Sequence, residues 1–574
     1  MKFAARTAMV LAVILILTAV ILPVPSGAAS YSYSNYERAV DLKILGLLAN
    51  SPDSFELGRA PTRVEGAVML VRLLGMEKQA KKSSYTHPFS DVPAWADCYI
   101  GYMYHNNLTN GIGDSKFGSD TLLSAKQYTT FVLRSIGYYD KIDFDYDNAL
   151  DKAIQTGLLG ASEGASLKKT TTFLRNDLVG ISYNALSAKL KASNLSLLDK
   201  LVNTDKTIFK PAARVLGLYT SDLKAEFEGV AAYKPAVTQY GSVVKSSNDM
   251  FLLLRKTLYS NEGQLKLDVR NYNGSAGDDF EEALTRAKAI VAEITGVSDF
   301  VSSWKLLSYS RTLTLTLKYR YTKSDFNQRI ENAKTAVNKA RYTVARLITA
   351  DMSEFDKEKK LHDYIVNNTR YDYQNYLKGT IPDESYEEYG CLVLGTAVCE
   401  GYSETMKLLC DLSSLECLVI TGRAKNGSNW ESHAWNLVRI DGAYYHLDAT
   451  FDDPVSKDGT NTLVYYYFNL PDSEMARSTT WDKSGYPVCT SIENSYYHKN
   501  SMIADSRASF DKAVHEALEL RRTMIELKVS DYSEVRYSNI SISDIVFKTA
   551  AVLKYRYSIN EELGIIRIYN IQYS

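Results

Sequence analysis

The sequence has little cysteine and no pair of cysteines at metal-binding spacing. Six cysteines occur in 574 residues, at positions 98, 391, 399, 410, 417 and 489, with no CxxC pair and no cluster with histidine. Zinc sites are built from such clusters, so the sequence predicts no metal and no cofactor. If one cysteine is a reactive thiolate, the other five cannot all pair with one another. We interpret Cys410 and Cys417 as buried free thiols.

An excess of charge of either sign is also missing. The formal net charge is −1 and the pI is about 6.7, so nothing indicates a nucleic-acid partner. Beyond the N-terminus, no apolar run is long enough to cross a membrane. At 574 residues the chain is too long for one core, and we expect several domains.

The N-terminus has the pattern of a secretory signal peptide. Lys2 and Arg6 precede an apolar run from Ala8 to about Leu22, and small residues follow up to Ala29. We expect residues 1–29 to be a signal peptide and the mature protein to lie outside the cytoplasm. The alternative is an uncleaved anchor, which would be the chain's membrane contact.

Three weak repeats follow between about residues 36 and 186. Each is read as a helix, a glycine-containing loop, a polar residue that caps the next helix, and that second helix. Units of this size bury little alone, so we expect them to pack as one helical module. The second helices are expected over Gly66–Leu74, Tyr128–Ile136 and Leu178–Leu186.

Residues 62–65 read Thr-Arg-Val-Glu, which resembles the Thr-Arg-Ala-Glu signature of the S-layer homology (SLH) family. The resemblance covers residues 33–190 and implies an all-α module that binds secondary cell-wall polysaccharide, on the cell surface or S-layer of a bacterium. Arg63 would contact the glycan, and we interpret Lys126 and Arg175 as the same slot in the other repeats. A cation at a helix start suits an acidic glycan. The alternative is that all three are ordinary solvated charges.

Two short α-β-α-β patterns bracket the middle of the chain. In the first, a clean alternating strand is expected over Leu313–Tyr321; in the second, a helix is expected over Ser543–Tyr555. No acids, bases or ligands cluster in either unit, so we expect two small α+β domains without chemistry of their own. Their expected ranges are 241–325 and 505–574, with a linker over 195–240.

Three residues of complementary chemistry lie between these units. Cys399 is followed by apolar residues at helical spacing, so it lies at or just before a helix N-terminus, where a thiolate is stabilised. Downstream, Asp441-Gly442 is a strong signal for a two-residue hairpin. Counting back from this turn places His433 and Asp448 on one face as diagonal neighbours, within side-chain reach. We interpret the three as nucleophile, base and orienting residue.

Two alternatives stay open at the level of residue pattern. The same register pairs His446 with Leu437 on that face, so His446 is a rival base. Each of the three residues could also be structural: a core cysteine, a satisfied histidine and a turn-capping aspartate.

The motifs around these residues resemble the core of the transglutaminase-like superfamily. The resemblance implies a papain-like α+β catalytic domain over residues 326–495, with Cys399 as nucleophile, His433 rather than His446 as base and acid, and Asp448 as orienter. Trp435 would wall the site. The backbone N–H of Cys399 is one oxyanion donor, and Tyr373 or Gln374 is a candidate for the second. The segments that carry the resemblance are 398–403, 433–436 and 446–454.

The expected activity is acyl transfer through a thioester. We favour a wall-anchored cysteine peptidase or amidase that acts on protein or wall peptide. The alternatives are a crosslinking transglutaminase, in which an amine resolves the acyl-enzyme, and a wall-bound scaffold without catalysis.

Overall fold

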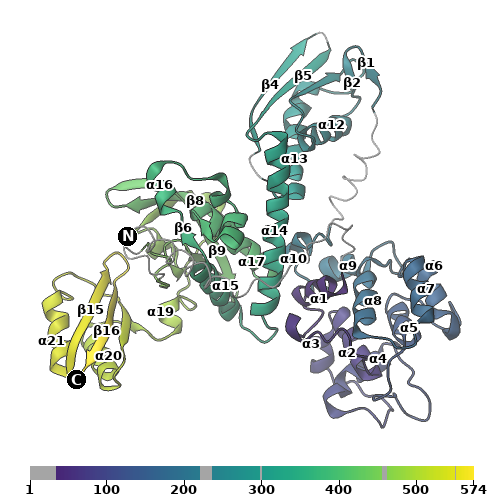
Figure 1. Cartoon of the computed structure of the whole chain (residues 1–574), viewed down its shortest axis with the longest axis horizontal. Helices are drawn as coiled ribbons and strands as arrows, with labels where there is room; N and C mark the ends of the chain where they lie inside the picture. Colours follow the sequence, from purple (N-terminus) through teal and green to yellow (C-terminus); the bar gives the residue numbers. More distant parts are fainter. Residues whose placement is uncertain (1–33, 220–234, 298–299, 310, 456–461, 550) are drawn as a thin grey trace, which may run out of the picture.

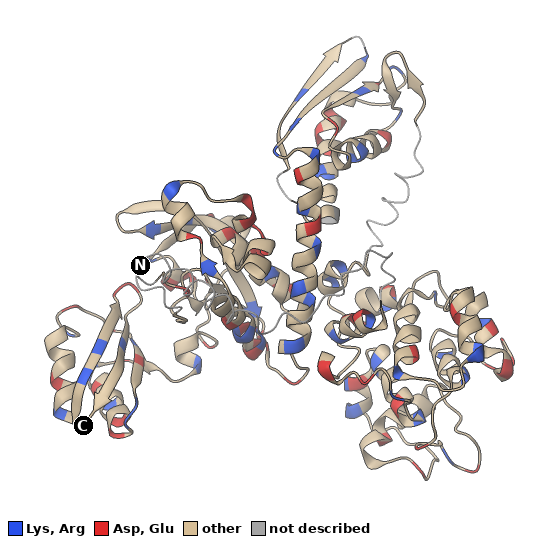
Figure 2. Cartoon of the chain, viewed as in Figure 1, with Lys and Arg blue, Asp and Glu red and all other residues tan. Residues whose placement is uncertain are grey.

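A computed structural model of the chain describes residues 34–219, 235–297, 300–309, 311–455, 462–549 and 551–574. The expected signal peptide, residues 1–29, lies outside them. Within these described ranges, no helix has the length and apolar character that a membrane span needs. Figure 1 shows a helical N-terminal module, a small α+β domain at the top, a central α+β core and a second small α+β domain. Acidic and basic residues are interspersed over all four parts on the side seen in Figure 2.

The N-terminal module is built of helices whose longer members start at capping residues. Thr62 and Ser124 accept hydrogen bonds from backbone N–H groups in the first turns of α2 and α5, so both helices begin about three residues before the apolar pattern does. The helices are α1 (Asn35–Ile44), α2 (Arg63–Leu73), α3 (Glu77–Lys82), α4 (Asp97–His105), α5 (Ala125–Ser135), α6 (Ala149–Gln155), α7 (Ala161–Lys169) and α8 (Arg175–Ser187).

The interval expected as a linker, 195–240, is folded at both ends. It carries α9 (Leu197–Asp199), a π-helical turn over Lys200–Thr204, α10 (Lys210–Val215) and strand β1 (Val237–Thr238). Small and apolar side chains in α9 and α10 are buried, which explains why these short segments fold although their sequence pattern is weak. Residues 220–234 of the interval lie outside the described residues.

The two small α+β domains share one topology. Their sheets have the orders β1-β2-β3-β5-β4 and β13-β14-β16-β15, with a parallel pair (β2/β3 or β13/β14) followed by antiparallel pairs. The first comprises β1, β2 (Gly241–Val243), α12 (Ser247–Tyr259), β3 (Gln264–Asp268), α13 (Ala276–Thr295), β4 (Val301–Tyr309) and β5 (Thr312–Tyr319). The second comprises β13 (Ile503–Ala504), α20 (Arg507–Glu519), β14 (Met524–Val529), α21 (Asn539–Thr549), β15 (Val552–Asn560) and β16 (Ile565–Tyr573).

The sequence pattern missed the short strands β1, β2 and β13 and one long edge strand in each small domain. β4 was not expected, and β15 begins at Val552, inside the helix expected over Ser543–Tyr555, which was wrong in its last part. Both are edge strands with mostly exposed side chains, so their apolar alternation is blurred.

The core begins with the long helix α14, which runs from the upper small domain down to where the core meets the N-terminal module (Figure 1). A five-stranded antiparallel sheet of order β11-β10-β9-β8-β12 packs against α17. The elements are α14 (Lys323–Leu347), α15 (Glu354–Asn368), β6 (Arg370–Tyr371), α16 (Tyr373–Lys378), β7 (Thr396–Ala397), α17 (Cys399–Leu412), β8 (Cys417–Asn426), β9 (Asn429–Ile440), β10 (Ala443–Leu447), β11 (Phe468–Leu470), α18 (Asp472–Met475), β12 (Thr479–Trp481) and α19 (Tyr496–Lys499).

The N-terminal module and the core are packed directly on each other. One apolar cluster continues from the module into the core, and α10 packs on α17. Arg341 of α14 donates from Nε to buried Asp41 of α1 at 2.9 Å, and Tyr36 stacks on Tyr342. Truncating the module would therefore expose part of the α+β core.

Candidate active site

Cys399 is the first residue of α17, and its side chain is partly exposed. The N–H groups of a first helical turn have no acceptor within the helix, so this position stabilises negative charge on sulfur. Gly401 lets the helix approach the preceding loop, because a Cβ there would lie 2.6 Å from the carbonyl oxygen of Ser385. The helix placement of Cys399 is as the sequence predicted.

His433 and Asp448 are brought together by the hairpin of β9 and β10. Asp441 and Gly442 form the two-residue turn with φ of 50° and 87°, and His446 pairs with Leu437, in the register predicted from this turn. The Nε2 atom of His433 lies 2.6 Å from Oδ2 of Asp448. The predicted diagonal pair is present.

Asp448 is itself fixed by the backbone that follows it. Its Oδ1 accepts hydrogen bonds from the N–H groups of Thr450 and Phe451, at 3.1 and 3.0 Å. The other carboxylate oxygen is therefore directed at His433. Because the side chain of Asp448 is buried, water does not compete for this bond.

The imidazole of His433 lies between Asp448 and the Cys399 thiol, and both affect its protonation. With Nε2 held by Asp448, the nitrogen available to sulfur is Nδ1. Burial disfavours the imidazolium, but the charges of Asp448 and Cys399 outweigh it and raise the pKa of His433 to about 10. The site thus favours the imidazolium form of His433.

Two aromatic rings fix the plane of this imidazole. Phe451 stacks on His433 with ring centroids 4.5 Å apart and an interplanar angle of 19°, and Trp435 stacks at 5.8 Å and 23°. Trp435 thus lies against the imidazole, and its role as a wall of the site stays a prediction. Phe451 was missed as a site residue, although it belongs to a motif segment that the sequence resemblance rests on.

His446 is engaged by two other residues. Its Nδ1 accepts the indole N–H of Trp435 at 2.9 Å, and its Nε2 lies 2.9 Å from Oδ1 of Asp472. Both ring nitrogens are occupied, and burial lowers the pKa of His446. The structure therefore places His433, not the rival, next to Cys399. Asp472 is the first residue of the four-residue helix α18, and a helix this short has no sequence periodicity that could have indicated the contact.

His446, Asp472 and Cys489 also offer ligand atoms within 4.8 Å of one another. A metal at Nε2 of His446 would have to displace the proton that this nitrogen carries. Because Nδ1 already accepts the N–H of Trp435, the ring would become an imidazolate, which is costly. The residues present thus fit a hydrogen-bonded group better than a metal site.

Two tyrosines lie near the nucleophile: Tyr371 in strand β6 and Tyr386 at the end of the 3-10 turn Asp383–Tyr386. Tyr371 pairs with Ala397 in the strand before Cys399, and the charge of Cys399, second to burial, contributes to the raised pKa of Tyr371 and of Tyr386. The proposed oxyanion donors Tyr373 and Gln374 begin α16, where Tyr373 stacks on Tyr376. Their role as donors stays a prediction, and the position of Tyr386 near Cys399 was not foreseen.

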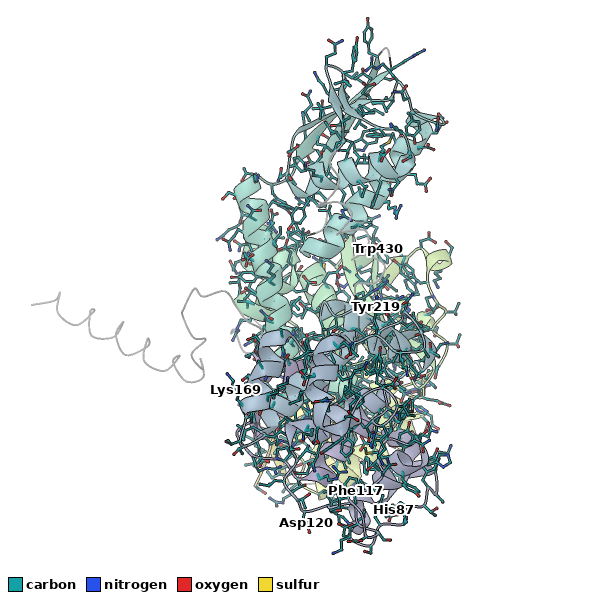
Figure 3. The ribbon with its side chains drawn as sticks, turned by 90° about the vertical axis from the view of Figure 1, so that its right-hand side faces the viewer. His87, Phe117, Asp120, Lys169, Tyr219 and Trp430 are labelled. Atoms are coloured by element: carbon teal, nitrogen blue, oxygen red, sulfur yellow. The ribbon has the colours of Figure 1, made fainter. Side chains whose placement is uncertain are left out.

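Arg63 of the N-terminal module is nearly buried and lies against a cavity. Its Nε donates to the carbonyl oxygen of Phe117 at 2.9 Å, and its guanidinium lies 4.9 Å from the ring of Phe117 and 4.7 Å from that of Phe131. Figure 3 labels Phe117 near the lower end of the module. Burial lowers the pKa of Arg63 to about 10. Within the described part of the chain, no carboxylate forms an ion pair with it.

The cavity beside Arg63 has a volume of about 290 Å³ and is also lined by Gln127, Arg134 and Tyr146. Arg134 pairs with Asp140 at 2.6 Å. Arg63 and the side chain of Tyr146 at one cavity suit an anion with hydroxyl groups.

The three basic residues of the repeats do not occupy one slot. Arg63 and Arg175 are each the first residue of their helix, and each donates from Nε to a phenylalanine carbonyl, Phe117 and Phe55. In the second repeat Ser124 is the cap, so Ala125 holds that position. Lys126 is turned away by about 100° and pairs with Asp147 at 2.7 Å. The assignment of Lys126 to the slot was therefore wrong by one residue.

A sequence model of the transglutaminase-like superfamily matches residues 341–449. This chain contains a transglutaminase-like domain. The matched interval begins in α14 and ends one residue after Asp448, so it includes Cys399, His433 and Asp448.

Relatives of known structure and of curated sequence are distant. A TGase crystal structure is 18% identical, covering 34% of this chain and 52% of its own, with a TM-score of 0.19. A Cytophaga hutchinsonii protein described as a cysteine protease is 15% identical, covering 33% and 70%, with a TM-score of 0.17. A cell surface protein of Thermoanaerobacter kivui is 32% identical and a middle cell wall protein of Brevibacillus brevis is 23% identical, each over 24% of this chain. The chain matches 18% and 14% of the lengths of these two relatives.

Proposed function

We propose that this protein is a cell-surface cysteine peptidase or amidase that works through a thioester. The observation that carries the proposal is the imidazole of His433, held by Asp448 on one side and within reach of the Cys399 thiol on the other. Residue order, helix start and hairpin register support the same roles.

The reaction takes place in two steps. The Cys399 thiolate attacks the carbonyl carbon of an amide or peptide, and an S–C bond forms as the C–N bond breaks. His433 gives its proton to the leaving amine. Water then attacks the thioester carbonyl, His433 accepts the proton of the water, and the thiolate leaves with its electron pair. The carboxylate of Asp448 stabilises the imidazolium throughout.

The second candidate differs only in what resolves the thioester. If a primary amine attacks in place of water, the product is a new amide and the enzyme is a transglutaminase. The acidic side chains Glu400 and Glu431 occur near the site, and Glu431 accepts a hydrogen bond from Tyr376. Negative charge of this kind would attract a protonated amine donor.

One experiment distinguishes hydrolysis, amine transfer and a scaffold without catalysis. The mature chain is incubated with bacterial wall peptides and a dansylated primary amine, beside Cys399→Ala and the matched control Cys98→Ala. New peptide termini that need Cys399 support hydrolysis, and dansyl incorporation that needs Cys399 supports transfer. If no product depends on Cys399, both enzymatic proposals fail.

We further propose that the N-terminal module anchors the protein to an acidic glycan of the cell wall. The support is the nearly buried Arg63 beside a cavity that also holds Arg134 and Tyr146. Two relatives are named as a cell surface protein and a middle cell wall protein, which agrees with a bacterial surface location. Arg175, which donates the matching hydrogen bond to the carbonyl oxygen of Phe55, would be a second contact for the glycan.

Anchoring is best tested by point variants, because removing the module would expose the catalytic core. Arg63→Ala should lose most of its co-sedimentation with purified cell walls. Lys126→Ala, which removes a partly exposed cation paired with Asp147, is the matched control and should sediment like the wild type. Equal sedimentation of Arg63→Ala and the wild type would contradict the anchoring role.

A further inference from the structure

Trp435 lies between two histidines that the hairpin places on one face of the sheet. Its indole ring stacks on His433, the proposed base, and its Nε1–H donates to Nδ1 of His446 at 2.9 Å. Only 1% of the surface of Trp435 is exposed, so solvent does not hold this indole. Its orientation is set by protein contacts.

The hydrogen bond from Trp435 determines the tautomer of His446. An indole N–H is a donor and never an acceptor, so Nδ1 of His446 must be unprotonated. The proton of the neutral ring is therefore on Nε2, which donates to Oδ1 of Asp472 at 2.9 Å. The burial that lowers the pKa of His446 keeps the ring neutral, in agreement with this geometry.

Asp472 is in turn held by the chain around it. It starts α18, its N–H donates to the carbonyl oxygen of Cys489 at 2.8 Å, and its Oδ1 accepts the N–H of Cys489 at 3.3 Å. A directed hydrogen-bonded chain thus runs from Trp435 through His446 to Asp472, and it ends on fixed backbone.

The side chains packed around Trp435 leave its indole ring only one position. Trp481 meets Trp435 edge to face with centroids 5.8 Å apart. Gly422 lies opposite His433 in the neighbouring strand, and a Cβ on it would come within 2.9 Å of the indole ring. The indole is therefore wedged by packing and directed by His446.

A proton donor and acceptor such as His433 needs both its direction and its plane fixed. Asp448 fixes the direction of the ring by holding Nε2, and the stacked rings of Phe451 and Trp435 fix the plane. If the indole tilts, the imidazole plane rotates about the bond to Asp448, and Nδ1 moves away from the sulfur of Cys399.

We propose that His446 and Asp472 are positioning residues for the catalytic base. They hold the Trp435 indole, and the indole keeps the His433 imidazole in the plane in which Nδ1 faces the sulfur of Cys399. The inference rests on the proposed function of Cys399, His433 and Asp448. It also gives the second Cys-His-Asp group a role that requires no metal and no second nucleophile.

The test uses variants that separate the hydrogen bond from the space the ring fills. His446→Leu removes the acceptor, and Trp435→Phe removes the donor while a ring still stacks. His446→Gln is the rescue variant, because its amide oxygen can accept from Trp435 and its NH₂ group can donate to Asp472. Two readouts are taken from the full mature chain: kcat and KM with the substrate of the function assay, and the rate of Cys399 alkylation by iodoacetamide against pH.

His446→Leu and Trp435→Phe should each lower kcat by about 10- to 100-fold with little change in KM, because small misplacements of a reacting group have effects of this size. His446→Gln should keep kcat within about 3-fold of the wild type, because its amide preserves both hydrogen bonds and the reacting group is not misplaced. In the Trp435→Phe background, His446→Leu should add almost nothing, because the interaction it removes is already absent. Both single variants should also slow Cys399 alkylation near neutral pH.

Additive effects of His446→Leu and Trp435→Phe would overturn the proposal, and so would a wild-type kcat and alkylation profile in either single variant. If His446→Leu does not fold, the comparison of Trp435→Phe with His446→Gln still decides, because the first must lose activity and the second must not. The alkylation arm needs no substrate. A wild-type Cys399 that reacts no faster than a free thiol would refute the proposed function itself, which is a different outcome.

Discussion

Two groups of the same composition lie on either side of Trp435. Each has one cysteine, one histidine and one aspartate: Cys399, His433 and Asp448 in the first, and Cys489, His446 and Asp472 in the second. In the first group the pKa of the histidine is raised to about 10, whereas in the second it is lowered. The same residue types therefore produce opposite protonation states.

The difference arises from the partner of the second ring nitrogen. Nδ1 of His433 faces a thiol at a helix start, whose negative charge favours the imidazolium. Nδ1 of His446 faces an indole donor, which forbids a proton there. Cys489 is buried, and burial together with Asp472 raises the pKa of its thiol to about 12. Residue type alone does not separate a catalytic group from a structural one.

The largest expected effect separates the two thiols. Cys399→Ala should lower kcat/KM by about 10⁴-fold or more, because it removes the nucleophile. Cys489→Ala should stay within about 5-fold, because Asp472 keeps its bond to His446. Steady-state rates with the substrate of the function assay measure both. Similar losses in the two variants would mean that the groups are not functionally distinct.

The next largest effect is the difference in kcat between variants of the two aspartates, Asp448 and Asp472. Asp448→Asn should lower kcat by about 10³- to 10⁴-fold, because the amide cannot stabilise the imidazolium of His433. Asp472→Asn should cost less than about 10-fold, because its amide oxygen can still accept the proton of His446. The check is kcat at saturating substrate, and a larger loss for Asp472→Asn would reverse the assignment.

The pH dependence of the rate should follow the raised pKa of His433. Asp448 and Cys399 raise this pKa to about 10, so the imidazolium persists above neutral pH and is lost as the pH rises through that value. The alkaline limb of kcat/KM should therefore lie near pH 10. In Asp448→Asn the pKa of His433 must fall, because burial lowers it and the charge of Asp448 no longer raises it. The alkaline limb of kcat/KM should then shift toward neutral pH. An unshifted limb would assign it to another group.

The smallest effect concerns the glycine that makes room for the shared indole. In Gly422→Ala the new Cβ would lie 2.2 Å from the carbonyl oxygen of Thr480, so the strands must move, at a cost of about 1–3 kcal/mol in the free energy of unfolding. Because Trp435 moves with them, kcat should also fall, by about 10-fold.

The matched control for that variant is Gly277→Ala in α13, where a Cβ meets open space. There the helix propensity of alanine should stabilise the protein by up to about 1 kcal/mol. Thermal unfolding and steady-state rates report both effects. Gly422→Ala with unchanged stability and kcat would show that the indole has more room than its contacts indicate.

The sequence predicted those parts of the candidate site that depend on turn length and on helix periodicity. The turn at Asp441-Gly442 has a fixed length, so the strand register, and with it the approach of His433 to Asp448, follows by counting. The helix start at Cys399 follows from apolar spacing. These local rules did not exclude His446, because that decision depends on Trp435 and Asp472, which only the folded chain brings to it.

What the sequence did not predict depends on contacts between distant segments or on edges of sheets. Asp472 starts the four-residue helix α18 and Cys489 lies in a loop, so neither has sequence periodicity. β4 and β15 are edge strands with little buried face. The slot of Lys126 was misassigned because the capping residue, rather than the basic residue, sets the phase of its helix.

The most direct test of the contrast is site-resolved alkylation of the native mature protein with limiting iodoacetamide at neutral pH, read by peptide mass spectrometry. We expect Cys399 to be modified far faster than Cys489, and we expect Asp448→Asn to slow modification of Cys399 and leave Cys489 unmodified. Alkylation of Cys399 at the rate of a free thiol, or an equal rate at the two cysteines, would contradict the account.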